Sequence, residues 1–160
     1  TPRQIQRQSP ALGATNHGTL LGVAFGQFQA ESLAALATYG PLRLTPWRMI
    51  LVETTNPISA INGVITDPDD PLLNVIACTG APGCSQGLIE TRPLARALAG
   101  QLPPGQTLHS SGCAKGCAHP NPAPLTITGS PQGLDLIRNG RAGDPPQPSG
   151  LTADQLLKAI

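Results

Sequence analysis

Aromatic side chains are nearly absent from this sequence. They make up 2% of the 160 residues, whereas hydrophobic residues of all kinds make up 39%. A hydrophobic core must therefore be built from Leu, Ile, Val and Ala. Long apolar runs are also missing, since none approaches the roughly 18 residues that a transmembrane helix requires. We therefore expect no membrane partner.

Charge is sparse as well. Ten Lys and Arg balance nine Asp and Glu, which leaves a net charge of +1. The basic residues are scattered singly and form no stripe of the kind that nucleic-acid binding requires, so we expect no nucleic-acid partner. No secretory signal peptide is recognisable, and we expect a cytoplasmic protein. The first residue is Thr1 rather than Met, which we interpret as a sign that the chain is a piece of a longer protein.

Glycine and proline are abundant in place of these absent types, with 18 residues of each. Both residues favour turns and loops, so irregular structure should occupy much of the chain. The stretch "GDPPQPSG" at 143–150 is the strongest candidate for disorder.

Hydrophobic patterning predicts interleaved strands and helices, and therefore an α/β (α+β) fold with a mixed sheet. The polar stretch "TDPDDP" at 66–71 predicts a boundary between two units, 1–66 and 67–160. Residues 1–16 show no clear period and read as an arm. The expected strands cover 19–25, 42–54 with an interruption near Pro46, 72–78, 106–109, 124–129 and 133–140. The expected helices cover 30–40, 56–63, 85–99 with a kink at Pro93, and 152–160.

The chain has four cysteines, arranged in two close pairs. Cys78 and Cys84 are spaced C-x5-C, and Cys113 and Cys117 are spaced C-x3-C. Four thiolates are the full ligand set of a cubane iron–sulfur cluster, so the pattern predicts a [4Fe–4S] cluster. Glycines surround both pairs and should allow sharp turns and bring backbone N–H groups close to sulfur; these are Gly80, Gly83, Gly112 and Gly116. Cys84 also precedes the expected helix from residue 85, whose positive end would favour a thiolate.

Two other uses of four cysteines remain open. Disulfides are typical of small secreted domains, and nothing else in this sequence indicates secretion. In a structural zinc site the two cysteines of a pair are usually separated by two to four residues. The second pair has this spacing, and the first pair does not.

Beyond the spacing, C-x5-C followed by S-G-C-x3-C resembles the cluster motif of the siroheme-dependent sulfite and nitrite reductases. The segment "LRLTPWRMILVE" resembles the strand of the ferredoxin-like half domain that precedes their cluster domain. Within that superfamily, "RLTPWR", "DPDDP", "CTGAPGC" and "SGCAKGCAHP" resemble the precorrin-3B synthases. On this likeness residues 1–66 comprise the arm and a ferredoxin-like half domain, and residues 67–160 form a [4Fe–4S] cluster domain.

The resemblance implies an oxygen-dependent monooxygenase of aerobic cobalamin biosynthesis. Its members convert precorrin-3A to precorrin-3B by ring hydroxylation and γ-lactone formation. The implied cofactors are the [4Fe–4S] cluster on Cys78, Cys84, Cys113 and Cys117 and a further mononuclear non-haem iron, while siroheme is less favoured. The implied partners are a tetrapyrrole substrate, an electron donor and an N-terminal half of the same protein, because family members contain this pair of domains twice.

The residues that would bind substrate follow from the same likeness and from charge. Arg43 and Arg48 fall where the reductases place arginines near the tetrapyrrole, and Arg can grip a carboxylate with two hydrogen bonds. Lys115 and His119 lie in or beside the second cysteine loop and could donate a hydrogen bond to a substrate carboxylate or to the cluster. No catalytic residue is identified.

Ligands for a mononuclear iron are harder to find in the sequence. His17 and His109 are candidates, but no H-x-D/E pattern of a facial triad accompanies them, and an ordinary surface or core histidine is the simpler interpretation.

Two further functions stay open. One is a fragment of a siroheme-dependent sulfite or nitrite reductase. The sequence signature of these reductases has an acidic residue at the position of Pro124, so the proline favours the synthase branch. The third interpretation is a non-catalytic iron–sulfur module that transfers electrons.

Overall fold

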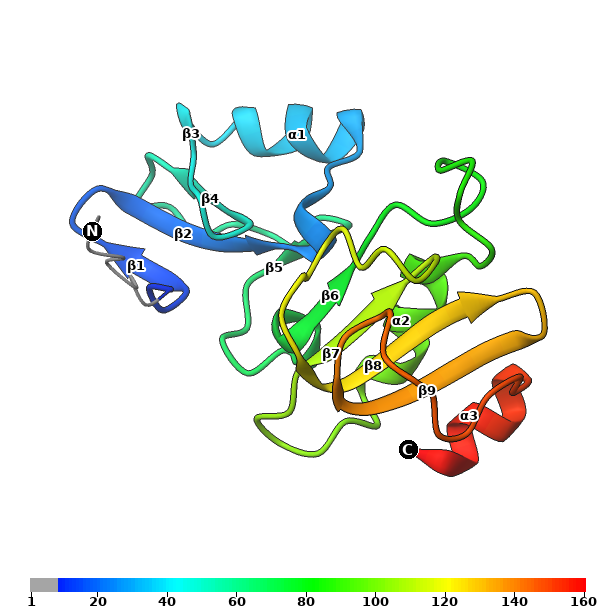
Figure 1. Cartoon of the computed structure of the whole chain (residues 1–160). Helices are drawn as coiled ribbons and strands as arrows, with labels where there is room; N and C mark the ends of the chain where they lie inside the picture. Colours follow the sequence, from blue (N-terminus) through cyan, green and yellow to red (C-terminus); the bar gives the residue numbers. More distant parts are fainter. Residues whose placement is uncertain (1–8) are drawn as a thin grey trace, which may run out of the picture. The chain divides into compact units, whose positions relative to one another are not determined.

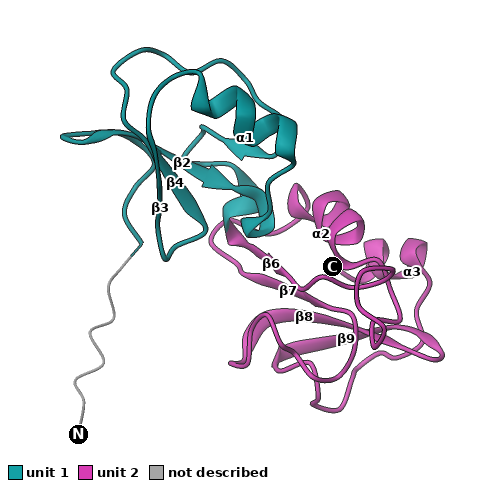
Figure 2. Cartoon of the chain, turned by 90° about the horizontal axis from the view of Figure 1, so that it is seen from above, with its two compact units in different colours: residues 1–73 teal, residues 74–160 magenta. Residues whose placement is uncertain are grey.

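The structure is a computed structural model that describes residues 9–160. It divides the chain into two units, residues 1–73 and 74–160, which Figure 2 shows in different colours. The division falls after Leu73, a little beyond the predicted boundary at residue 66. Each unit has its own sheet (Figure 1), and no helix of the described part is long and apolar enough to cross a membrane.

From residue 9 on, unit 1 is an antiparallel sheet with one α-helix. The strand order is β1-β2-β4-β3, and β5 also pairs with β2. Leu36 of the helix packs with sheet residues Leu21, Val23, Ile50 and Val52, so aliphatic side chains form the core as the composition predicts. The elements are β1 (Gly13–Thr15), β2 (Gly18–Val23), a 3₁₀ turn (Ala24–Gly26), α1 (Ala30–Ala37), β3 (Leu42–Leu44), β4 (Met49–Val52) and β5 (Val64–Ile65).

The segment predicted as one interrupted strand, 42–54, is a hairpin. Pro46 and Trp47 lie in the turn, and β3 and β4 pair antiparallel with Leu44 opposite Ile50. Proline has no N–H to donate and fits a turn better than a ladder.

The helix predicted over 56–63 does not form. The Thr54 hydroxyl accepts the Asn56 N–H and the Tyr39 hydroxyl accepts the Ser59 N–H. These hydroxyls hold the two amides in turn and loop geometry, and the segment remains a loop.

The arm predicted over 1–16 is partly a strand. Residues 1–8 lie outside the described part, but β1 pairs with β2 across a tight turn at residues 16–17. Glycine is required at the end of that turn, because Gly18 has a φ of 133° and a Cβ there would lie 2.1 Å from the Val52 carbonyl oxygen. A strand of only three residues beside a polar turn is too short to show an alternating hydrophobic pattern, so the sequence did not predict it.

Unit 2 contains a mixed sheet, as predicted. Its order is β6-β7-β8-β9; β6, β7 and β8 are parallel neighbours, and β8 and β9 form an antiparallel hairpin. A short 3₁₀ helix at Pro71–Asn74 leads into it. The elements are β6 (Val75–Ala77), α2 (Thr91–Ala99), β7 (Leu108–Ser111), β8 (Ala123–Ser130), β9 (Gly133–Gly140) and α3 (Ala153–Ala159).

Helix α2 is shorter than the helix predicted over 85–99. It begins at Thr91, which places Pro93 in the first turn. The first amides of a helix have no partner within it, so proline costs little there and a helix beginning at Ser85 would have placed it in the interior. The Leu88 amide instead donates to the Gly112 carbonyl. The predicted helix end next to Cys84 is therefore wrong.

The segment predicted to be disordered, 143–150, runs along β9. The Leu136 amide donates to the Pro148 carbonyl, the Gln147 amide donates to the Leu136 carbonyl, and Leu151 forms a β-bridge with Leu134. The segment thus covers the edge of the sheet at β9. We call residues 143–151 the edge strap. Helix α3 follows with the predicted Thr152 cap, whose side chain and Gln155 form a capping box.

The two parallel connections of the sheet differ in kind. Between β6 and β7 the chain forms α2, whereas between β7 and β8 it forms a loop with no helix, residues 112–122. Parallel neighbours are usually joined through a helix that covers one face of the sheet. Here the connection is the second cysteine loop.

Candidate metal centre

The first cysteine loop begins where β6 ends. The Cys78 amide donates to the Ser110 carbonyl of β7, and the Thr91 hydroxyl donates to the Cys78 carbonyl at 2.6 Å. The Cys84 amide donates to the Gly80 carbonyl at 2.8 Å and closes a tight turn. Gly80 has a φ of 63°, and a Cβ there would lie 2.7 Å from the Thr91 hydroxyl. The expectation that Gly80 allows a sharp turn is confirmed.

The second cysteine loop lies directly against the first. The Gly112 N–H donates to the Cys78 sulfur at 3.1 Å, and the Gly112 carbonyl accepts the Leu88 N–H at 2.8 Å. A Cβ on Gly112 would lie 3.1 Å from the Gly87 Cα and 3.2 Å from the Gly80 Cα. The absence of a side chain at residue 112 thus lets the two loops touch, and the predicted N–H donation to sulfur occurs there.

The remaining glycines show mixed outcomes. Gly116 has the expected positive φ, 60°, and lies in the middle of the C-x3-C segment. Gly83 and Gly112 do not have a positive φ; at Gly112 the close approach, rather than the dihedral angle, requires glycine.

The thiols differ in exposure. Cys78, Cys84 and Cys113 are half-buried, Cys117 is exposed, and all four are unpaired by disulfides. Within residues 9–160 no three His, Cys, Asp or Glu side chains converge closely enough to hold a single metal ion. A cubane binds each thiolate to a different iron, so its ligands stand farther apart than those of one ion. Four free thiols on two touching loops, with an N–H aimed at one sulfur, fit that donor set.

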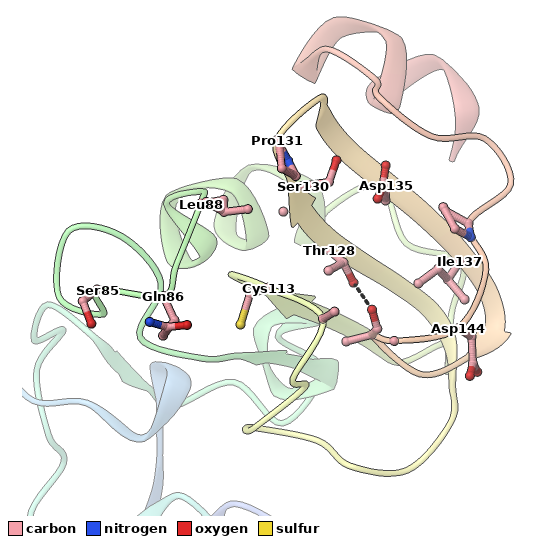
Figure 3. A pocket seen from close by; sticks show the side chains of 15 residues that line it. Ser85, Gln86, Leu88, Cys113, Thr128, Ser130, Pro131, Asp135, Ile137 and Asp144 are labelled. Atoms are coloured by element: carbon pink, nitrogen blue, oxygen red, sulfur yellow. Dashed lines mark hydrogen bonds between the residues drawn. The ribbon is translucent and has the colours of Figure 1, made fainter.

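A pocket of about 560 Å³ opens beside Cys113 (Figure 3). Its wall combines the first cysteine loop at Ser85 and Gln86 with the hairpin and edge strap at Asp135 and Asp144. Both carboxylates accept backbone N–H bonds, Asp135 from Gly150 and Asp144 from Arg141, and so hold the strap in place. The pocket lining includes no Lys or Arg. An anionic ligand would be repelled here.

The cations predicted to bind substrate belong to different units. Lys115 is exposed in the second cysteine loop, and His119 is half-buried close behind it. Arg43 lies on β3 and Arg48 in the β3–β4 turn, where Arg48 has a φ of 57°. Arg43 forms an ion pair with Glu53 across the hairpin, and these two residues share a pocket of about 400 Å³ with His17. A substrate carboxylate would have to compete with Glu53 for Arg43.

His109 lies on β7 and is fully buried. Burial, with a smaller contribution from His119, lowers the pKa of His109 to about 4, so the ring is neutral near pH 7. The two rings meet edge to face with their centroids 5.6 Å apart. His17 is exposed in unit 1. The suggestion that His17 or His109 binds a mononuclear iron stays a prediction.

Comparisons with known proteins identify two relatives by sequence. The chain is 34% identical over 157 residues to a precorrin-3B synthase from Sinorhizobium sp., a match that covers 85% of this chain and 34% of that protein. It is 28% identical over 139 residues to a ferredoxin–nitrite reductase from Leptolyngbya laminosa, covering 72% of this chain and 27% of the relative. The chain therefore spans about a third or less of the length of these relatives. No known family profile matches it.

A solved structure supports the same fold. The structure of the NirA protein of Mycobacterium tuberculosis matches 70% of this chain and 25% of the NirA chain, with a TM-score of 0.54 and 20% identity. At that identity the match concerns the fold alone. The two sequence relatives agree with the resemblance found in the cysteine motifs. By sequence, the chain is a homologue of a segment of precorrin-3B synthase.

Proposed function

We propose that this chain is the cluster-bearing segment of a precorrin-3B synthase-like oxygenase. The observation that carries the proposal is the 34% identity to precorrin-3B synthase over 85% of the chain. The contact between the two cysteine loops supports it, because the residues that would bind one inorganic centre lie on adjacent segments of unit 2.

The ligands of the centre would be Cys78, Cys84, Cys113 and Cys117. When bound, a [4Fe–4S] cluster supplies one-electron transfer at a potential that hydrogen bonds to its sulfurs adjust. The chain provides such a bond in the Gly112 N–H, which donates to the Cys78 sulfur. The Thr91 hydroxyl and the Ser110 carbonyl fix the backbone of Cys78 from both sides.

The proposed substrate is precorrin-3A, a tetrapyrrole that carries several carboxylates. Arg43, Arg48, Lys115 and His119 are the side chains that would bind these groups. The pocket beside Cys113 does not suit them, since its charged lining residues are Asp135 and Asp144. We therefore do not assign the carboxylates to this pocket. An electron donor and a further segment of the same protein complete the proposed enzyme.

A second candidate function is supported by the nitrite reductase relative. The chain would then be a segment of a siroheme-dependent reductase that acts on a small oxyanion. The optical spectrum of the anaerobically purified full-length protein separates the two, because siroheme gives sharp porphyrinoid bands and a cluster alone gives a broad shoulder. Sharp bands would favour the reductase.

The cluster assignment is tested by Cys113→Ser, measured as iron and acid-labile sulfide per chain after anaerobic reconstitution. Serine keeps the size of the side chain but removes the soft thiolate ligand, so we expect most of the iron to be lost. Ala114→Ser is the matched control, since it changes an exposed neighbour in the same loop without removing a thiol. Iron content unchanged in Cys113→Ser would contradict the assignment.

A further inference from the structure

On one face of the unit 2 sheet, His109 is a buried polar side chain without a hydrogen-bond partner, unlike the hydroxyls around it. It is fully buried, and neither of its ring nitrogens has a hydrogen-bond partner among residues 9–160. A neutral imidazole carries one N–H and one lone pair. Leaving such groups buried without a partner costs on the order of 1–3 kcal/mol each.

The neighbouring hydroxyls show that partners are otherwise supplied on this face. His109 stands opposite Thr126 in the β7–β8 ladder, and Ser111 stands opposite Thr128. Each of these hydroxyls donates to a carbonyl: Thr126 to Gly140, Thr128 to Ala142 and Ser111 to Cys113. The opposite face carries Ser110, which donates to Thr91 of α2. The unpartnered imidazole is therefore on the side away from α2.

The second cysteine loop covers the His109 ring on that side. A Cβ on Gly116, between Cys113 and Cys117, would lie 3.6 Å from the His109 Cε1 atom. The His119 ring meets it edge to face from the end of the same loop. Both neighbours thus belong to the segment that carries two of the proposed ligands.

We propose that His109 is a positioning residue for the metal centre, and that its ring N–H donates to the sulfur shell of the group that the second cysteine loop holds. The inference rests on the proposed [4Fe–4S] cluster. It goes further by assigning the buried imidazole a partner and an effect on the reduction potential. Lys115 and His119 are exposed or half-buried, whereas His109 is fully buried and cannot turn to solvent.

An electronic effect follows from the direction of the hydrogen bond. An N–H that donates to sulfur stabilises the more negative, reduced state of a cluster and so raises its potential. Removing the donor should favour the oxidised state. We expect a change of about tenfold in the reduction equilibrium, which for a one-electron couple is about 59 mV.

The experiment compares His109→Leu and His109→Gln in the full 160-residue chain, reconstituted anaerobically. Leucine fills similar space without a donor, and glutamine restores an N–H near the position of Nε2. Three quantities are measured: iron and sulfide per chain, the midpoint potential by spectroscopic redox titration, and the thermal unfolding of the metal-free chain. Thr126→Val is the control, because Thr126 is equally buried and stands opposite His109 but bonds to the Gly140 carbonyl, away from both cysteine loops.

We expect His109→Leu to lower the midpoint potential, His109→Gln to restore most of it, and Thr126→Val to leave it unchanged. We also expect the metal-free leucine variant to unfold at the wild-type temperature or above, because it no longer buries unpartnered polar atoms. If the leucine variant does not fold, the glutamine variant and a His109→Met variant are compared in the same way.

Two results would overturn the inference, and they can be told apart. A wild-type chain that takes up no iron and sulfide would remove both the proposed cluster and the role of His109. A wild-type chain that loads normally, with an unchanged potential in the variants that lack the donor, would leave the cluster in place. His109 would then be only a core residue.

Discussion

His109 links the stability of unit 2 to pH. Burial and the nearby His119 lower its pKa to about 4, whereas a histidine in an unfolded chain titrates near 6.5. Between these values the unfolded chain binds more protons than the folded chain, so the free energy of unfolding falls as the pH falls through this window. Above it the imidazole is neutral in both states and the penalty disappears.

The prediction is a loss of about 2 kcal/mol of unfolding free energy for the metal-free wild-type chain between about pH 7 and about pH 5, attributable to His109. It is measured by urea denaturation of wild type and His109→Leu at both pH values. The leucine variant should lose less stability by that amount, and this difference cancels the contribution of other titrating groups. Equal losses in the two proteins would contradict the prediction.

Single residues also show which features of the candidate site could be predicted from the sequence. The cysteine spacing predicted two pairs serving one centre, and the Gly112 N–H does donate to the Cys78 sulfur. The ligand assignment itself stays a prediction. The pairing of Arg43 with Glu53 could not be foreseen, because it depends on the hairpin that places the ends of 42–54 side by side. The burial of His109 likewise follows from strand register rather than from local sequence.

At the scale of elements, the two cysteine loops depend on one close backbone contact. Gly112→Ala would place a methyl group about 3.1 Å from the Gly87 Cα and 3.2 Å from the Gly80 Cα. Both neighbours are backbone atoms that cannot rotate away, so we expect a loss of about 1–3 kcal/mol of stability. The hydrogen bond to the Cys78 sulfur should lengthen, and the iron content after reconstitution should fall.

Gly100→Ala is the matched control for this change. Gly100 follows α2 with a φ of −72°, and nothing lies within 4 Å of the position of its missing Cβ. Alanine there should be neutral or slightly stabilising, because it reduces the freedom of the unfolded chain. Equal stability and iron content in Gly112→Ala and wild type, by urea denaturation and iron assay, would show that the loops do not require this contact.

The prediction of helices and strands succeeded where the hydrophobic pattern agreed with the turn and capping residues at the ends of the segment. Strands β8 and β9 and the Thr152-capped helix α3 match their predicted segments closely. Strand β7 lies two residues later than predicted, and the beginning of the strand predicted over 72–78 is a 3₁₀ helix. The prediction failed at 56–63 and 85–90, where hydrogen bonds to side chains or to the neighbouring cysteine loop hold the segments in other conformations. It also failed at the edge strap, whose prolines indicated disorder although β9 offered it a free edge. Each failure reflects a tertiary hydrogen bond that no local window contains.

At the scale of the whole molecule, each unit contains a complete sheet, and no strand of the described part pairs across the division. Both cysteine pairs belong to unit 2, and so does His109. Segments with their own sheet and core commonly fold alone.

A fragment of residues 74–160 should therefore fold without unit 1. We expect it to unfold cooperatively in urea and to take up the same iron and sulfide per chain as the 160-residue chain. The Cys113→Ser version of the fragment is the control for nonspecific iron. A fragment that lacks cooperative unfolding would show that unit 1 contributes to the stability of unit 2.

The helix-free crossover between β7 and β8 has a consequence for maturation in the cell. Backbone hydrogen bonds to β7 and to the first loop hold the flanks of this segment, Cys78 to Ser110 and Leu88 to Gly112, and they require no inorganic ligand. The proposed cluster would therefore be inserted into a sheet that is already folded, and not into an unfolded chain. Cys117, the one exposed thiol among the four cysteines, would be the proposed ligand most accessible to a cluster donor.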